Sequence, residues 1–211
     1  MRVILVNGSP KKEGCTFTAL SEVEKALQAE SIQTQIFQLS DYGAIEGCRD
    51  CRYCHKNEGY CIVGDFVNDF IALAKEADGF IFGTPVYYAS ASGQITSFMD
   101  RVFFSNFRNG NTFRGKPVAA IASCRRGGST AALDQLNKYF TISQMPVVSS
   151  QYWNMVHGNT PDEVRKDEEG MQIMRTLGKN MAWLLKAIEA GRAVGIDLPP
   201  EEKIISTNFI R

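Results

Sequence analysis

The sequence predicts an α/β protein built on a doubly wound, five-stranded parallel sheet. Two observations carry this prediction. Five short apolar runs rich in branched residues have the composition of buried strands, and segments with helical periodicity alternate with them along the chain. Because right-handed crossovers join alternating strands and helices, the sheet is expected to be parallel, with helices on both of its faces.

The expected elements follow one another without a linker, repeat or low-complexity run. Strands are expected at residues 3–6, 34–37, 80–82, 118–122 and 147–148, and helices at residues 16–29, 65–77, 94–104, 130–142 and 168–190. The common arrangement of five such strands is the flavodoxin-like order 2-1-3-4-5. We therefore expect a single domain over residues 1–211, with a cysteine-rich loop at 43–63. Residues 191–211 contain paired prolines and many polar side chains, and are expected to form a C-terminal arm.

Charge and composition exclude several classes of function. Lysine plus arginine and aspartate plus glutamate both number 23, so the net charge gives no general attraction for nucleic acid or an anionic membrane. The amino-terminal residues lack the features of a signal peptide, and no apolar run approaches the length of a membrane span. We expect a cytoplasmic protein, in which the reducing thiol pool disfavours a disulfide network.

Ligands of such sheets bind beyond the carboxyl ends of the strands, so the loops after the first, third and fourth strands are the places to examine. The first, GSPKKEGCT at residues 8–16, precedes a helix and carries two lysines. Free N–H groups and the helix dipole favour an anion there, and the hydroxyls of Ser9 and Thr16 are potential donors. The spacing matches neither a Walker A loop nor a dinucleotide-binding loop. The same residues are also ordinary turn formers.

The other two loops offer aromatic and cationic side chains. The second, GTPVYYASASG at residues 83–93, places Tyr87 and Tyr88 where they could line a flat ring, although paired tyrosines also close cores and oligomer interfaces. The third, SCRRGGST at residues 123–130, offers glycines for close backbone approach and two arginines for a negative group. Arginines in such a turn are usually solvated.

These pieces together resemble the NADPH-dependent FMN reductase family of the flavodoxin-like superfamily, and more narrowly the iron-sulfur flavoproteins. The resemblance is carried by GSPKKEGCT, the cysteine run, GTPVYYASASGQITSFMDR, the SCRRGGS loop and the late helix DEEGMQIMRTLGKNMAWLLK, which together span nearly the whole chain.

The resemblance implies that an FMN phosphate lies in the first loop, near Ser9, Lys11, Cys15 and Thr16. It places the flavin ring beside Pro85, Val86, Tyr87 and Tyr88 and beside the third loop, with Cys124, Arg125, Gly127 and Gly128. One departure is Cys15, where the family commonly has asparagine. A thiol at a helix start could have a lowered pKa and be oxidisable, or could simply be a small residue that fits.

A cluster of four cysteines follows the second expected strand, in the pattern C-x2-C-x2-C-x6-C formed by Cys48, Cys51, Cys54 and Cys61. A [4Fe-4S] cluster takes four thiolate ligands, and this spacing suits one. A structural zinc also takes four thiolates, but usually from two separated C-x2-C knuckles. Unloaded free thiols are the third alternative. The resemblance to iron-sulfur flavoproteins favours the [4Fe-4S] cluster as metal site.

We therefore expect an FMN-dependent oxidoreductase that passes electrons between NAD(P)H or a small redox protein and an acceptor. The absence of a recognisable acid–base pair or nucleophile agrees with chemistry carried by a flavin. The resemblance further implies a homodimer or homotetramer. The alternatives are a flavodoxin-like electron carrier without NAD(P)H turnover, and a zinc-stabilised binding protein without flavin.

Overall fold

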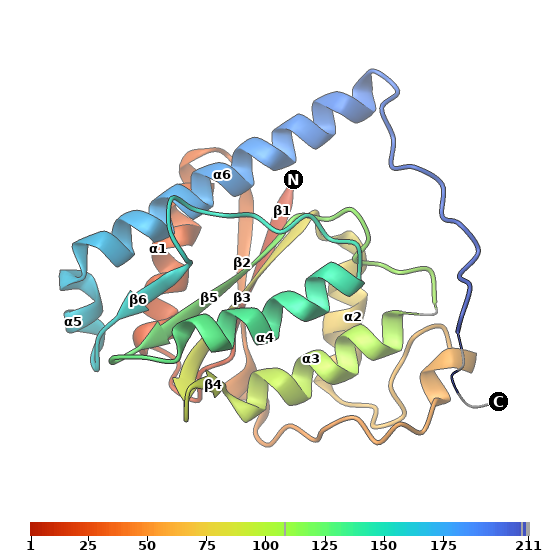
Figure 1. Ribbon diagram of the computed structural model, residues 1–211, viewed down its shortest axis with the longest axis horizontal. Helices are drawn as coiled ribbons and strands as arrows, with labels where there is room; N and C mark the ends of the chain where they lie inside the picture. The colour runs from red at the N-terminus through yellow and green to blue at the C-terminus, as the bar shows by residue number, and fades with distance from the viewer. Residues whose placement is uncertain (108, 208, 210–211) are drawn as a thin grey trace.

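The centre of the molecule is a six-stranded sheet, shown in Figure 1 as part of a computed structural model that describes residues 1–107, 109–207 and 209. Five strands are parallel and lie in the order β2-β1-β3-β5-β6. Their bounds are β1 (Arg2–Asn7), β2 (Gln33–Gln38), β3 (Gly79–Tyr87), β5 (Val118–Cys124) and β6 (Met155–His157). The flavodoxin-like class that the sequence predicts is confirmed, and the sheet has one strand more than the five that were expected.

Helices cover both faces of the sheet, as the alternating pattern predicts (Figure 1). One face carries α1 (Cys15–Ala29) and α6 (Glu168–Ala193), preceded by the short α5 (Pro161–Lys166); the other carries α2 (Phe66–Glu76), α3 (Gly93–Asn106) and α4 (Ser129–Ile142). Two 3-10 turns, η1 (Leu39–Tyr42) and η2 (Tyr53–Lys56), lie in the connection between β2 and α2. All five predicted helices are present, with ends shifted by at most three residues.

The core is divided by the sheet into two layers because successive side chains of a strand point to opposite faces. In β1, Val3 and Leu5 pack under α1 and α6, whereas Ile4 and Val6 pack under α2, α3 and α4. All four side chains are fully buried. This two-sided burial explains why residues 3–6 of β1 are all apolar rather than alternating with polar residues.

The fifth strand differs from the prediction. Residues 147–148 were expected to form it, but Val147 makes only an isolated bridge to Val118, and Val148 donates its N–H to the Val118 carbonyl at 2.8 Å. The chain then leaves the sheet, exposing Tyr152 and Trp153, and returns as β6. The edge strand is therefore split, and its longer part pairs with the carboxyl end of β5.

The second loop also differs from the prediction, because most of it belongs to strands. β3 runs on through Tyr87, and β4 (Ser90–Ala91) returns antiparallel to it as a tight hairpin. Pro85 is compatible with this extension because it stands at the last position of the β3–β5 ladder, opposite Ser123, where a missing N–H costs little.

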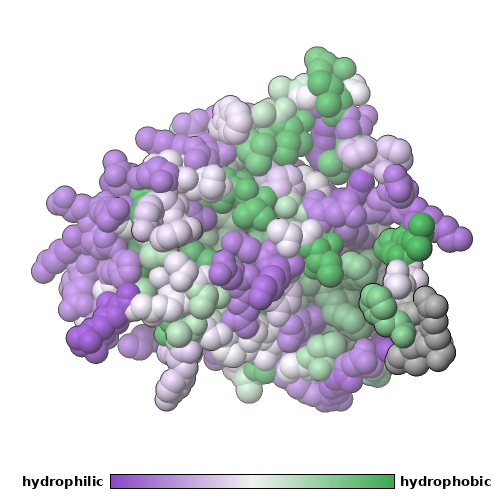
Figure 2. Space-filling view, in the orientation of Figure 1, coloured by the Kyte–Doolittle hydropathy of each residue, from purple (hydrophilic) through white to green (hydrophobic). Residues whose placement is uncertain are grey.

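The described residues after α6 carry neither helix nor strand and cross to the opposite side of the molecule (Figure 1). The Leu198 side chain lies over Gly115, and Arg114 donates to the Pro199 carbonyl at 2.5 Å. Figure 2 shows apolar atoms exposed at the end of α6 and along this arm, where Ile196, Ile204 and Ile205 are largely exposed. Among the described residues, no helix is both long enough and apolar enough to cross a membrane.

Candidate functional site

The first, second and third loops, at residues 8–16, 83–93 and 123–130, meet at the carboxyl edge of the sheet, as the sequence predicts. The Gly8 N–H donates to the Gly83 carbonyl at 2.8 Å, and the Ser92 hydroxyl donates to the Gly8 carbonyl at 3.0 Å. A Cβ atom on Gly128 would stand 2.5 Å from the Ala89 Cα, so the third loop touches the second. The structure therefore brings all three sequence segments together around one edge.

The first loop is held by side chains that bind its carbonyl groups. Besides Ser92, the Gln38 side-chain amide donates to the Ser9 carbonyl at 3.1 Å, and the Asn7 amide donates to the Lys12 carbonyl at 3.3 Å. Asn7 is fully buried at the end of β1. The N–H groups of Gly8, Ser9 and Lys11 are also bonded within the protein, so the loop keeps a fixed shape, and the N–H groups left for another partner are those at the start of α1.

Two helices begin at this edge without a capping side chain. α1 starts after Gly14 and α4 after Gly128, and neither residue supplies a side-chain acceptor. The other four α-helices in the described part of the chain are capped by Asp65, Ser92, Thr160 and Asp167. Free N–H groups at a helix start attract anions, and among the α-helices of the described residues the two starts without a side-chain cap both follow one of the three loops.

The predicted phosphate donors occupy different roles. The Ser9 hydroxyl accepts the Lys11 N–H at 3.1 Å, which leaves its own proton free to donate. Thr16 is buried, and its hydroxyl lies 2.7 Å from the Ser123 hydroxyl, so it joins α1 to β5. Lys11 is exposed, whereas Lys12 forms an ion pair with Asp41 at 2.5 Å.

Cys15 is the first residue of α1 and is partly buried. Its Sγ lies 3.7 Å from the Gly158 carbonyl oxygen in the loop after β6. Burial raises the pKa of the Cys15 thiol above its usual value, and this effect outweighs nearby Lys11, which lowers it. The suggestion that the helix start gives this thiol a lowered pKa is therefore wrong.

The hairpin of the second loop projects its two tyrosines outward. Tyr88 and Ala89 form the two-residue turn, with φ of 48° and 59°, a conformation that normally selects asparagine or glycine. The Tyr88 side chain is fully exposed and Tyr87 is about half exposed. The side-chain carbonyl of Gln135 in α4 accepts from the Ser90 hydroxyl at 2.7 Å and from the Ala91 N–H at 3.1 Å, which fixes the hairpin on α4.

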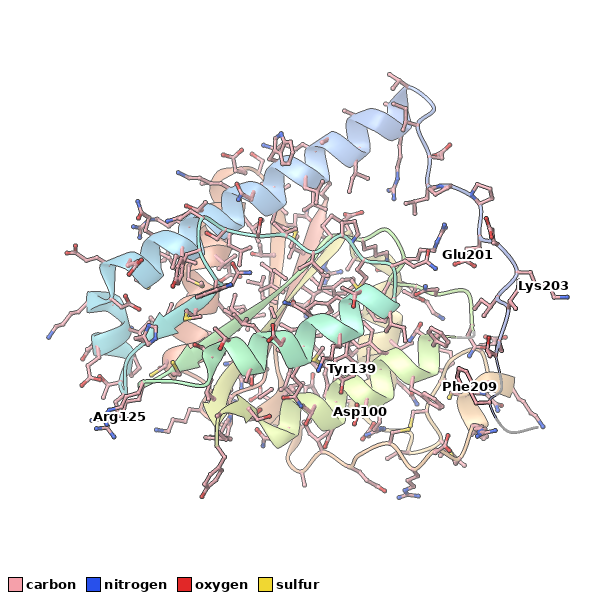
Figure 3. All side chains as sticks on the ribbon, in the orientation of Figure 1. Asp100, Arg125, Tyr139, Glu201, Lys203 and Phe209 are labelled. Carbon is pink, nitrogen blue, oxygen red and sulfur yellow. The ribbon has the colours of Figure 1, made fainter. Side chains whose placement is uncertain are left out.

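The third loop presents its arginines to solvent. Arg125 and Arg126 are exposed, and Figure 3 shows Arg125 pointing away from the end of β5. Cys124 is buried at the end of that strand, and burial raises the pKa of its thiol. Gly128 has φ of 95° and lies against Ala89, whereas Gly127 has open space where a side chain would be.

The four clustered cysteines line a single pocket, whose walls also include Arg101 and Phe104. Cys54 is buried, Cys61 is partly buried, and Cys48 and Cys51 are exposed. Burial raises the pKa of Cys54, and the other three thiols of the group raise it further, which reflects their proximity. Asp50 and Arg52 adopt positive φ of 47° and 57°, and these left-handed turns coil the segment between the cysteines.

Comparison with known proteins identifies the family. A family model described as NADPH-dependent FMN reductase matches residues 1–160, which is most of the chain. The protein belongs to the NADPH-dependent FMN reductase family. Its members are oxidoreductases by that description.

Several relatives of this FMN reductase family member are named iron-sulfur flavoproteins. One from Methanocaldococcus jannaschii is 34% identical over 196 residues, covering 90% of this chain and 100% of its own. One from Archaeoglobus fulgidus is 29% identical over 198 residues, covering 89% and 98%. Among solved structures, RosB with a bound riboflavin-phosphate intermediate is similar in fold, with a TM-score of 0.72, 12% identity and coverage of 100% and 94%. An archaeal flavodoxin has a TM-score of 0.59, 16% identity and coverage of 88% and 99%.

The first loop of this family member fits the phosphate of FMN. Phosphate is a hydrogen-bond acceptor of high negative charge. The loop offers it donors at the uncapped start of α1 and at the Ser9 hydroxyl, and it offers a cation at the exposed Lys11. No side-chain cap of α1 would compete with the phosphate, because the N-cap residue is Gly14.

The cysteine pocket brings together four thiols, which is the number of ligands that a [4Fe-4S] cluster takes. Tetrahedral zinc with Zn–S bonds near 2.3 Å requires its sulfur ligands to lie about 3.8 Å apart. In the described part of the chain, no three His, Cys, Asp or Glu side chains gather into a set that would hold one metal ion. In a [4Fe-4S] cluster each thiolate binds its own iron, so the four sulfur ligands lie farther apart than those of one zinc ion.

Several residues that support the site were not predicted from the sequence. Asn7, Gln38 and Ser92 hold the first loop, and the loop after β6 contacts Cys15. The signal for Asn7 was available, because a lone polar residue at the end of an apolar strand needs a partner. Gln38 and Ser92 could not be predicted, because their partners lie far away in the sequence.

Proposed function

We propose that this protein is an FMN-dependent oxidoreductase that passes electrons between NAD(P)H or a small redox protein and an acceptor. The observation that carries the proposal is the pair of uncapped helix starts at the carboxyl edge of the sheet, in a chain of the FMN reductase family. We also propose that it acts in the cytoplasm as a homodimer or homotetramer.

In this proposal the first loop holds the phosphate. The N–H groups at the start of α1 and the Ser9 hydroxyl donate to its oxygens, and Lys11 balances its charge. Thr16 and Cys15 act indirectly, by fixing α1 against β5 and against the loop after β6.

The hairpin and the third loop would hold the ring. Backbone groups from Pro85 to Tyr88 and the glycine turn Gly127–Gly128 offer hydrogen bonds to its polar edge, while Tyr87 and Tyr88 offer aromatic surface. Arg125, which is exposed, would supply a cation for a negative group of the ring or of a nicotinamide co-substrate, and the buried Cys124 would support the third loop from below. When bound, FMN supplies hydride acceptance and one-electron transfer, and the chain supplies orientation and hydrogen bonding.

We propose further that Cys48, Cys51, Cys54 and Cys61 bind a [4Fe-4S] cluster. The positive φ of Asp50 and Arg52 supports this, because left-handed non-glycine residues cost about 1–3 kcal/mol each and persist where the surroundings require them. The names of two relatives agree with a cluster in this protein, since the proteins from Methanocaldococcus jannaschii and Archaeoglobus fulgidus are called iron-sulfur flavoproteins.

The deciding experiment is a visible absorption spectrum of protein purified without oxygen, with iron and acid-labile sulfide assayed on the same sample. Flavin bands with about four irons per chain are the expected result. Flavin without iron would reject the cluster and leave an FMN reductase. A colourless protein that contains zinc would reject the flavin, and one-electron cycling without NAD(P)H turnover would indicate a carrier instead of an enzyme.

The ring position is tested by changing Tyr87 or Tyr88 to alanine. Loss of aromatic surface is expected to weaken FMN binding or to shift the flavin spectrum, at a scale of about 1 kcal/mol, which is roughly a fivefold change in Kd. Tyr152→Ala, at a similarly exposed tyrosine outside the three loops, is the control. Unchanged FMN affinity and spectrum in both loop variants would contradict the assignment.

A further inference from the structure

A buried arginine in α3 lies beside the cysteine pocket. The Arg101 side chain is fully buried and forms an ion pair with Asp65, with its Nη2 2.6 Å from Oδ1 and its Nη1 2.8 Å from Oδ2. Asp65 is also the cap of α2, where it accepts the Val67 N–H at 3.2 Å. Burying a guanidinium is costly without such a partner, so the pair fixes α3 to the start of α2.

The rest of the guanidinium faces Cys61. Its Nε and Nη2 each lie 3.4 Å from the Cys61 sulfur, and its Nη1 lies 3.4 Å from the Glu46 carbonyl oxygen. The guanidinium stays charged, as arginine does in proteins, and the Asp65 carboxylate balances its charge. One planar guanidinium therefore donates hydrogen bonds both to the Asp65 carboxylate and to the Cys61 thiol.

Cys61 is also fixed through its backbone. Its N–H donates to the Asn68 side-chain oxygen at 2.7 Å, and its carbonyl accepts from the Asn68 amide at 2.9 Å. Asn68 belongs to α2, so the sulfur and the backbone of Cys61 are held by two different helices. Cys48 and Cys51, by contrast, are exposed on the loop.

We infer that Arg101, oriented by Asp65, is a positioning residue for the metal site: it holds the Cys61 sulfur in place and donates two N–H groups to it. The inference rests on the proposed cluster at the four cysteines. Reduction adds negative charge to a cluster, and N–H donors to its sulfur ligands stabilise the reduced form. Arg101 therefore raises the reduction potential of the cluster and slows its loss.

Two variants remove the hydrogen bonds from Arg101 to the Cys61 sulfur without changing the net charge of the protein. Arg101→Lys keeps a cation opposite Asp65, but a single ammonium lacks the fork that reaches both the carboxylate and the sulfur. The double variant Asp65→Asn/Arg101→Gln keeps the net charge and leaves no unpaired buried charge. Lys56→Gln, at an exposed lysine in the same segment, is the control for loss of one positive charge.

The measurements are the midpoint potential of the cluster in an anaerobic spectroelectrochemical titration and the rate of iron release to a chelator, on holoprotein. Both variants at Arg101 are expected to have a lower potential and several-fold faster iron release than the wild type, with Lys56→Gln unchanged in both. Should Arg101→Lys fail to fold, as judged by circular dichroism, the double variant decides.

The two possible failures are distinguishable. Wild-type protein that carries no iron after anaerobic purification would overturn the proposed cluster and this inference together. Iron-loaded wild type whose potential and iron-release rate are matched by both Arg101 variants would overturn the inference alone. A shift of equal size in Lys56→Gln would also overturn it, because loss of any nearby charge would then suffice.

Discussion

At the scale of single residues, Gly128 decides whether two of the three loops can meet. Its φ of 95° lies in the left-handed region, and a Cβ there would stand 2.5 Å from the Ala89 Cα. Gly127, its neighbour in the sequence, has no atom within 4 Å of the same position. Two adjacent glycines that look alike in the sequence therefore have different requirements.

We predict that Gly128→Ala lowers the free energy of unfolding by about 1–3 kcal/mol, because it adds left-handed strain and a backbone contact that cannot relax easily. FMN affinity is expected to fall as well, since the hairpin would move away from α4. Urea denaturation and a flavin fluorescence titration measure the two effects. Gly127→Ala is the matched control and is expected to change either quantity little; equal effects at both positions would contradict the explanation.

At the scale of elements, the carboxyl end of α2 is completed by a lysine from another segment. Lys116, two residues before β5, donates to the carbonyls of Ala74 and Lys75 at 2.8 and 3.1 Å. Burial lowers the pKa of Lys116 to about 8, and Arg192 adds to this effect while Asp78 opposes it. A cation at a helix carboxyl end offsets the dipole, but this one does so at the cost of desolvation.

This element gives a pH-dependent prediction. In the unfolded chain a lysine has a pKa near 10.4, so between about pH 8 and 10 the unfolded state binds more protons at this site than the folded state. The contribution of Lys116 to the free energy of unfolding therefore rises with pH across that window. The free energy of unfolding of the wild type minus that of Lys116→Met, measured by urea denaturation from pH 7 to 10, should increase with pH.

The control for this experiment is Lys25→Met, at an exposed lysine whose side chain is 75% accessible. Its difference from the wild type should remain flat over the same range. A flat difference for Lys116→Met as well would mean that the folded-state pKa is not lowered.

Sequence patterns predicted regular elements well where burial dominates. β1 and α4 follow from apolar periodicity alone, and Asp65 as the start of α2 follows from capping preference. The split edge strand and the β3–β4 hairpin did not follow. Tyr88 and Ala89 lack the Asn-Gly signal of such a turn, and the turn is stabilised by contacts far away in the sequence, such as those of Ser90 and Ala91 with Gln135, 45 and 44 residues away.

At the scale of the whole molecule, the two core layers are formed without the cysteine segment. Apolar residues of the sheet pack against the five long helices, and the segment at 43–63 contributes only a few partly buried contacts, such as those of Ile45 and Tyr60. Helices α3 and α4 are joined by a hydrogen bond from Tyr139 to Asp100, independently of the cysteines; both side chains are labelled in Figure 3.

We therefore predict that removing iron from the holoprotein leaves the sheet and helices folded. Far-ultraviolet circular dichroism should be nearly unchanged after anaerobic chelation, with one cooperative but earlier thermal transition. The segment itself should lose protection in hydrogen exchange, whereas β1 and β3 keep theirs. Loss of cooperativity across the sheet would show that the cysteine segment supports the core.

The uncapped start of α1 has a practical consequence for anyone who handles the flavin-free protein. On the proposed assignment, inorganic phosphate or sulfate in the buffer competes for the same N–H groups and stabilises the folded chain by mass action. At a hundred times its Kd, such an ion would add about 2.7 kcal/mol to the apparent free energy of unfolding. Melting temperatures recorded in phosphate and in Tris would then describe two ligation states, and variants must be ranked in a buffer without oxyanions.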